Sequence, residues 1–337
     1  MFPPLSTKLR TVLFLFLAVL VFTGVNGCAR VAGTKAAAQM RYPVSALAFS
    51  PDGTKIVTSI GPKSTVWNVE TGKELASLEN AVPSIYCFAF SPDGKTIAGG
   101  MEKVIHFWNA ETGKMEKTLE GNKSGLCGLA FSADGKILVS AAALYNFKTT
   151  IIELWLWDVE TGKKIAELDP KQWVLTCLAM APDRKSFAVG SRDKSVKIWS
   201  LADKKELATI QLSGPIDHLA YSSDGKYLAV ADEIPTVTLI DTATWKPKGQ
   251  VENLEDVVVT SVAFSPDGKH LAGGINDQTV KVWEVPSLKP ATTLSGHAQT
   301  VKEVAYSPNG QTLASGSQDG EVRLWDTGTG QTRVILK

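Results

Sequence analysis

Residues 301–337 read VKEVAYSPNGQTLASGSQDGEVRLWDTGTGQTRVILK, and the fold can be worked out from this stretch. It contains four short runs of five or six residues, a length typical of strands. The runs lie at residues 301–306, 312–317, 321–325 and 332–336. Pro308-Asn309-Gly310 separates the first two runs and Gly328-Thr329-Gly330 the last two, and tight turns favour such residues. The stretch therefore predicts one sheet of four antiparallel strands.

The same unit recurs seven times along the chain. Each copy has a turn related to Ser-Pro-Asp-Gly-Lys, and its Asp or Asn is found at Asp52, Asp93, Asp134, Asp183, Asp224, Asp267 and Asn309. Successive turns are 41, 41, 49, 41, 43 and 42 residues apart. A tryptophan follows every turn except the fifth, where Ile240 holds its place.

This repetition predicts how the sheets are arranged. A sheet that is apolar on both faces cannot cover itself, whereas radial stacking in a closed ring buries both faces and leaves only short edges. We therefore expect an all-β protein, a seven-bladed β-propeller with four antiparallel strands per blade, over residues 43–337. We expect the last unit to supply its own fourth strand, at residues 332–336. Pairing of residues 36–42 with the last blade is the alternative.

Three motifs carry a resemblance to a known family. Residues 264–269 read FSPDGK, residues 313–317 LASGS and residues 322–326 VRLWD, and in this order they resemble the WD-repeat propellers. The resemblance covers about 294 of the 337 residues. It implies a rigid ring whose loops between second and third strands, together with the loops leading into first strands, bind peptides or protein segments.

The resemblance also implies a buried hydrogen-bond set in the last unit. Members of the family often combine a His before the first strand, a Ser or Thr on the second, an Asp in the next turn and the Trp; here these are His297, Ser317, Asp319 and Trp325. Buried polar groups are tolerated where they satisfy one another. We therefore interpret His297 as structural, with a metal ligand or a catalytic base as the alternative.

No catalytic, metal or cofactor site is predicted. The chain lacks zinc-like cysteine spacing, a phosphate-binding loop and a nucleophile elbow. Asp217 and His218 could resemble an acid/base pair, but neighbouring strand residues point to opposite faces. Cys87, Cys127 and Cys177 fall on first strands and are interpreted as small buried hydrophobes. An enzyme with a substrate at the axial channel remains the alternative.

The third unit carries the candidate partner site. Its loop at residues 142–153 has about eight additional residues, including Tyr145 and Phe147, and Trp173 lies in the next connecting loop. Exposed aromatic residues are enriched at binding hot spots, so we expect these three to form one apolar patch that binds a partner. In the alternative, Tyr145 and Phe147 pack on their own blade.

Residues 1–27 have the pattern of a signal peptide. Lys8 and Arg10 form a basic flank, and the apolar run at residues 11–25 is shorter than the roughly 20 residues that span a bilayer. The sequence Val-Asn-Gly-Cys that ends at Cys28 resembles a bacterial lipobox, although Asn26 departs from the small residue usual there.

This resemblance implies that Cys28 becomes the lipidated N-terminus and that residues 28–42 tether it to the propeller. Plain secretion and an uncleaved anchor are the alternatives.

Together these features predict a non-catalytic module for protein–protein interaction or scaffolding, tethered at a bacterial cell envelope. The chain would be secreted across the inner membrane and lipid-anchored, facing the periplasm or the surface, as a monomeric propeller within a complex. The formal charge of +1 argues against nucleic acid as a partner. A structural subunit of a larger envelope complex is a further alternative.

Overall fold

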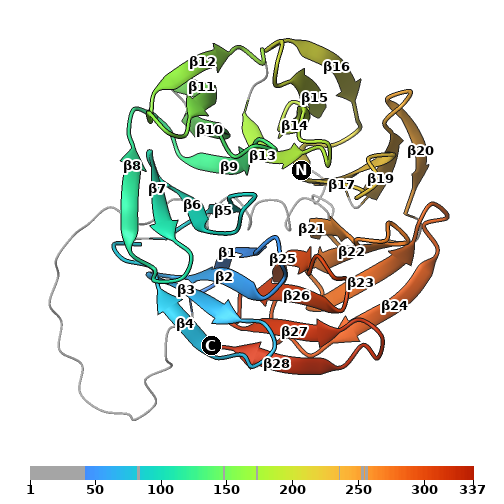
Figure 1. Cartoon of the computed structure of the whole chain (residues 1–337). Helices are drawn as coiled ribbons and strands as arrows, with labels where there is room; N and C mark the ends of the chain where they lie inside the picture. Colours follow the sequence, from blue (N-terminus) through green and yellow to red (C-terminus); the bar gives the residue numbers. More distant parts are fainter. Residues whose placement is uncertain are drawn as a thin grey trace, which may run out of the picture. The chain divides into compact units, whose positions relative to one another are not determined.

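The structure, a computed structural model, describes residues 42–81, 84–146, 149–171, 174–234, 236–251, 254 and 257–337, without the side chains of 145–149. These residues belong to the compact unit Arg41–Lys337. They form seven four-stranded antiparallel sheets arranged as a ring (Figure 1), which confirms the predicted seven-bladed propeller. Within the described part of the chain, no helix is long and apolar enough to span a membrane.

Each blade takes four consecutive strands, and the first strand of each lies innermost (Figure 1). Blades 1 to 4 comprise β1 (Val44–Phe49), β2 (Lys55–Ile60), β3 (Lys63–Asn68), β4 (Glu74–Ser77); β5 (Cys87–Phe90), β6 (Thr96–Met101), β7 (Val104–Asn109), β8 (Met115–Leu119); β9 (Leu126–Phe131), β10 (Ile137–Asn146), β11 (Thr149–Asp158), β12 (Lys164–Leu168); and β13 (Leu175–Met180), β14 (Ser186–Ser191), β15 (Ser195–Ser200), β16 (Glu206–Gln211). Blades 5 to 7 comprise β17 (Ile216–Tyr221), β18 (Tyr227–Asp232), β19 (Thr236–Asp241), β20 (Lys246–Gln250); β21 (Val259–Phe264), β22 (His270–Ile275), β23 (Thr279–Glu284), β24 (Pro290–Ser295); and β25 (Val301–Tyr306), β26 (Thr312–Ser317), β27 (Val322–Asp326), β28 (Thr332–Leu336).

The recurring turn is held by its own side chains. In blade 6 the hydroxyl of Ser265 donates to Asp267 Oδ1 at 2.6 Å, and the backbone N–H of Lys269 donates to the same oxygen at 3.0 Å. The N–H of His270 donates to Ser265 Oγ at 2.9 Å. Gly268 has a φ of +69°, which glycine adopts without strain. These contacts explain why serine, aspartate and glycine recur at fixed positions in the units.

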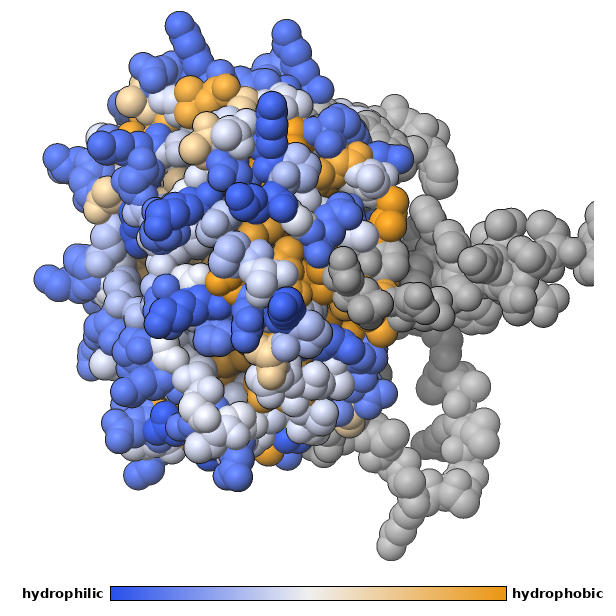
Figure 2. All heavy atoms as spheres, turned by 90° about the vertical axis from the view of Figure 1, so that its right-hand side faces the viewer, coloured by the Kyte–Doolittle hydropathy of each residue, from blue (hydrophilic) through white to orange (hydrophobic). Residues whose placement is uncertain are grey.

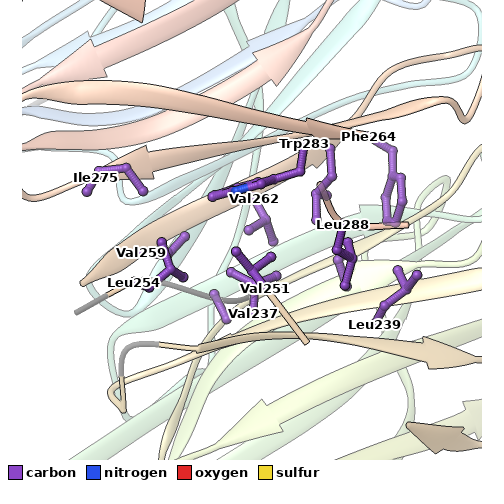
Figure 3. Close-up of a cluster of buried hydrophobic side chains, with 13 residues drawn as sticks. Val237, Leu239, Val251, Leu254, Val259, Val262, Phe264, Ile275, Trp283 and Leu288 are labelled. Atoms are coloured by element: carbon purple, nitrogen blue, oxygen red, sulfur yellow. The ribbon is translucent and has the colours of Figure 1, made fainter. Parts of the chain in front are cut away.

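The apolar core lies between blades rather than within them. In the cluster between blades 5 and 6, Trp283 of β23 lies over Val262 of β21, and both face residues of blade 5 such as Val237 (Figure 3). A comparable cluster separates each pair of neighbouring blades. Each blade therefore depends on its two neighbours to bury its faces.

Among the described residues, blade 7 is completed by its own fourth strand. β28 pairs with β27, so blade 7 is complete with its own residues, as expected. Blade 7 packs directly on blade 1, and a Cβ at Gly316 of β26 would come within 2.5 Å of Val44 Cγ1. Residues 36–41 of the alternative clasp lie outside the described residues.

One side of the ring is mainly polar. The side of the molecule shown in Figure 2 is mostly hydrophilic, with apolar residues in small separate groups. Such scattered apolar residues are usual on a soluble surface and do not by themselves mark a binding site.

Candidate functional site

His297, Asp319 and Trp325 of blade 7 lie in one buried hydrogen-bond network. His297 Nδ1 is 3.2 Å from Asp319 Oδ2, and Nε2 is 2.7 Å from Ser315 Oγ. Because a carboxylate only accepts, Nδ1–H donates to Asp319 and Nε2 accepts the Ser315 hydroxyl proton. Trp325 Nε1–H donates to Ser315 Oγ at 2.7 Å. Every polar group of this network therefore has a partner.

The serine that joins the network is Ser315, and the expectation for Ser317 was wrong. Ser317 donates to the carbonyl of Gln299 at 2.9 Å and accepts the N–H of Asp319 at 3.2 Å, so it fastens a connection instead. Trp325 pairs across the sheet with Leu313, which places the required hydroxyl two residues further along β26. The LASGS motif contains both serines, and only the strand register shows which of them bonds His297 and Trp325.

The imidazole of His297 is uncharged in this network. Burial lowers the pKa of His297, although Asp319 acts in the opposite direction. Burial would raise the pKa of Asp319, but hydrogen bonds from the N–H groups of Ala298 and Glu321 contribute to a net lowering. A neutral imidazole beside an ionised carboxylate, both shielded from solvent, stabilises the blade rather than offering a free base.

Blade 3 has the same network without its histidine. Trp157 Nε1–H donates to Ser140 Oγ at 2.8 Å, as in blade 7. Asn122 occupies the place of His297, after a glycine with positive φ, and is 6% exposed. Neither its amide oxygen nor its amide nitrogen has a hydrogen-bond partner. An asparagine side chain is shorter than a histidine, so the network stays incomplete.

Glu153 takes over the role of the turn aspartate in blade 3. This buried carboxylate accepts from the N–H of Lys123 at 2.8 Å, and from the N–H and hydroxyl of Ser124 at 3.1 and 2.9 Å. In blade 7 the equivalent acceptor for the N–H of Ala298 is Asp319. Glu153 thus ties β11 to the loop that leads into β9.

The additional residues of blade 3 extend two strands instead of forming a loop. β10 and β11 each have ten residues and stay paired from Ile137 and Asp158 to Asn146 and Thr149. The last partners on the flanking strands are Leu126 of β9 and Leu168 of β12. Residues 143–146 and 149–152 therefore project beyond the four-stranded sheet, and we call this two-stranded ribbon the blade 3 arm.

The arm presents apolar side chains. Leu144 is 38% exposed, whereas Ile152 packs partly against the core between blades 3 and 4. The side chains of Tyr145 and Phe147, and all of Trp173, lie outside the described residues, so neither arrangement expected for them is tested. Cys28 also lies outside them.

A cavity of about 460 Å³ lies at the foot of the arm, and we call it the blade 3 cavity. Its lining comes from the loop that leads into β9, from β11 and from β12: Glu120, Gly121, Lys123, Ile151, Ile152, Glu153, Trp155, Trp157, Gly162, Lys164 and Glu167. The sequence reading did not single out Trp155. The signal was available, because no other unit has a second tryptophan two residues before the repeated one.

Three other clefts repeat around the ring. They lie between blades 6 and 7, 1 and 2, and 4 and 5, beside the Pro-Asp-Gly turns, with volumes of about 740, 610 and 480 Å³. Their repetition at equivalent places indicates that blade geometry produces them. The blade 3 cavity is not part of this series.

The axial channel holds a second polar cluster. His218 Nε2 of blade 5 lies 3.8 Å from Glu303 Oε2 of blade 7, and the hydroxyl of Ser261, between them in blade 6, donates to the same oxygen at 3.4 Å. His218 Nδ1 accepts the N–H of Val262 at 3.3 Å, and Ser261 Oγ accepts that of Val304 at 3.2 Å. His218 therefore cannot act as the base for Ser261 in this arrangement, because Ser261 donates to Glu303.

Burial dominates the titration of the channel groups. It raises the pKa of Glu303 to about 7 and lowers that of His218 to about 4. Burial, assisted by Glu233, raises the pKa of Asp217 to about 6. Asp217 and His218 thus have different neighbours, as strand alternation predicts.

The three cysteines on first strands keep their thiols protonated at neutral pH. Burial raises the pKa of Cys87 and of Cys177 to about 12, and that of Cys127 well above its usual value. Among the residues that the structure describes, no three His, Cys, Asp or Glu side chains gather as metal ligands would.

Comparison with known proteins identifies the repeats. Residues 72–109 and 113–144 match the WD domain, G-beta repeat, and residues 175–335 match the Echinoderm microtubule-associated protein second beta-propeller. The chain therefore carries WD40 repeats within a β-propeller.

Its relatives include WD-repeat proteins. WD repeat-containing protein 1 of Gallus gallus is 35% identical over 130 residues, which cover 36% of this chain and 21% of the relative. WD repeat-containing protein SL1-17 of Schistosoma mansoni is 34% identical over 136 residues, 40% of this chain and 44% of the relative. The Periodic tryptophan protein 2 homolog of Dictyostelium discoideum is 26% identical over 168 residues, 44% of this chain and 18% of the relative. The matches thus span less than half of each relative.

Asn122→His should complete the blade 3 network. An imidazole at this position can bond Ser140 and Glu153, as His297 bonds Ser315 and Asp319 in blade 7. We expect the free energy of unfolding to rise by about 1–2 kcal/mol, because two buried unsatisfied groups are removed. Chemical denaturation measures this. The reciprocal variant His297→Asn should lower stability by a similar amount, and equal stabilities for all three proteins would contradict the network.

Glu303→Gln should change the pH dependence of stability. The folded-state pKa of Glu303, about 7, lies above its usual 4.5, so its contribution is fully present below pH 4.5 and is lost as the pH rises through 7. The free energy of unfolding of the variant relative to the wild type should therefore rise by about 1–3 kcal/mol from pH 5 to pH 8. The 29% exposure of the Glu303 side chain reduces this effect through solvent screening. Urea denaturation at both pH values tests this, and an unchanged difference would refute it. Asp217 titrates in both proteins and cancels.

Proposed function

We propose that the chain is a non-catalytic protein-recognition module that binds its partner through blade 3 and is tethered at a bacterial cell envelope. Its WD40 repeats and WD-repeat relatives support a scaffold for protein interactions. The rigid ring would present a preorganised surface, so that little conformational entropy is lost on binding.

The blade 3 arm is the observation that carries the proposal. It is the one place in the described ring where a hairpin extends to ten-residue strands, against four to six in the other blades. Ala143 and Ile152 at the base of the arm pack partly against the core, whereas Leu144 further along it is exposed. Apolar side chains on such a projection are suited to a protein interface. Tyr145, Phe147 and Trp173 would extend the same patch.

The channel supports a structural role better than a catalytic one. Ser261 bonds Glu303, and both Ser261 and His218 accept a backbone N–H from the next blade. Because His218 Nδ1 accepts the N–H of Val262, it does not serve as the base that a serine nucleophile needs. The alternative of an enzyme would require this arrangement to change on substrate binding.

The anchor rests on the sequence. The basic flank, the short apolar run and the lipobox-like Val-Asn-Gly-Cys support export followed by lipidation of Cys28. Attachment at the membrane would hold the propeller close to envelope proteins and raise their effective concentration.

Site-specific crosslinking tests the partner site. A photoreactive benzoylphenylalanine at position 144 should crosslink one stoichiometric protein in native membranes. The triple variant Tyr145→Ser, Phe147→Ser, Trp173→Ser in the same protein should lose at least about 90% of this product, because hot-spot side chains contribute most of the binding energy. Gel analysis with mass spectrometry identifies and quantifies the product.

The matched control places the same photoreactive group at position 207 in β16 of blade 4. Leu207 is also an exposed apolar residue, at 55%, but it lies on an outer strand away from the arm. Equal products from positions 144 and 207, or an undiminished product from a folded triple variant, would overturn the blade 3 site.

Cys28→Ala tests the anchor separately. The variant should move from the membrane fraction to the soluble fraction or keep its uncleaved leader, because the acceptor of the lipid is missing. Intact-mass spectrometry of the wild type should show a diacylated N-terminal cysteine. A wild-type protein that begins elsewhere and carries no lipid would refute lipidation and leave the crosslinking result intact.

A further inference from the structure

Trp155 stands where the other blades have threonine, histidine, lysine or arginine. It lies two residues before the repeated tryptophan, where blades 4, 6 and 7 have Lys197, Lys281 and Arg323. In blade 7 the Arg323 guanidinium lies over the Trp325 ring at 6.0 Å. Blade 3 has a second indole in that place, with ring centroids of Trp155 and Trp157 5.5 Å apart. Blade 3 therefore has a second indole, 5% exposed, in place of a cation.

The chain itself supplies a cation to this surface. Lys164 of β12 places its Nζ 3.9 Å from the centroid of the Trp155 ring and 2.6 Å from Glu167 Oε2. The ammonium is held between an aromatic face and a carboxylate, a geometry that favours positive charge. Lys164 is a flexible side chain, 36% exposed, so it can leave without disturbing the sheet.

The surroundings have a surplus of acidic groups. Glu120, Glu153 and Glu167 line the blade 3 cavity, against the two lysines Lys123 and Lys164. If Lys164 swings out, three carboxyl groups face one ammonium. The contact with Lys164 lowers the pKa of Glu167, so this carboxylate is ionised at neutral pH.

The loop that leads into β9 leaves room in the cavity. Asn122 lies between the lining residues Gly121 and Lys123, and its amide has no hydrogen-bond partner. Gly121 has no side chain, and a Cβ there would meet only the rings of Trp155 and Trp157, at 3.7 and 3.9 Å. The volume of about 460 Å³ exceeds what one ammonium group needs.

A guanidinium group fits this site better than an ammonium group. It is planar and stacks on an indole, it is more weakly hydrated, and its fork of donors can engage two carboxylate oxygens at once. An incoming arginine can therefore compete with Lys164, even though Lys164 is held near the ring by the chain.

We propose that the blade 3 cavity is a binding site for an arginine side chain of the partner protein, which stacks on Trp155, pairs with Glu167 and displaces Lys164. The cavity is continuous with the arm through Ile151 and Ile152, so this inference rests on the proposed function and names the side chain that the partner presents. Cations that bind more weakly than arginine would not displace Lys164 from the Trp155 ring.

The test uses N-acetyl-arginine-N-methylamide as the probe and the indole N–H signal of Trp155 in ¹⁵N-tryptophan-labelled protein as the readout, assigned with Trp155→Lys. We expect a saturable shift of this signal. Lys164→Met should bind the probe about three- to tenfold more tightly, because the competing ammonium is gone while the aliphatic stem remains. Glu167→Gln should weaken binding by a similar factor.

Two controls separate this site from general charge effects. N-acetyl-citrulline-N-methylamide has nearly the same shape without the charge and should not bind. Lys197→Met breaks a lysine–glutamate pair of the same 2.6 Å length in blade 4, with lysine where Trp155 stands, and should leave the affinity unchanged.

The proposal is overturned if Lys164→Met shows no saturable shift, if citrulline binds as well as arginine, or if Lys197→Met tightens binding equally. None of these measurements requires the partner. Loss of the crosslink at position 144 with intact probe binding would refute the proposed function and leave the arginine site in place, and the converse result would refute the site alone.

Discussion

Every blade of this protein has two apolar faces, and neither face can be buried by the blade's own residues. The buried clusters accordingly lie between blades, as in the contact of Trp283 and Val262 with the residues of blade 5 (Figure 3). A single missing blade would expose two such faces to water at once. At about 25 cal/mol per Å² of apolar surface, that exposure outweighs the loss of any one hydrogen bond in the structure. The closed ring is therefore the condition under which all the other features form.

The fold can be predicted well from the sequence because the same turn and strand residues occur in seven units. The turns follow from residues close together in the chain, such as Ser265, Asp267 and Gly268, whose contacts need no distant partner. Strand order follows from the period, and the pairing of β28 with β27 follows from a complete last unit.

The details of the polar networks could not be predicted in the same way. Ser315 and Ser317 lie on the same β26, and only the pairing of Trp325 with Leu313 determines which hydroxyl the indole reaches. The assembly of His218, Ser261 and Glu303 brings three units together in the channel, and no short motif encodes a contact between blades. Trp155 and Asn122 differ from the repeat in the sequence itself. Their roles, however, depend on the position of Lys164 and on the blade 3 cavity, which the sequence does not give.

The seam between blade 7 and blade 1 has a mechanical consequence. No strand crosses it within the part of the chain that the structure describes, where side-chain packing such as the close approach of Gly316 to Val44 holds its two sides. Within each blade, by contrast, the strands are laced together by backbone hydrogen bonds. Tension applied between Val44 and Lys337 would therefore separate blade 7 from blade 1 first. The remaining blades would then unfold one after another from the two ends of the opened ring.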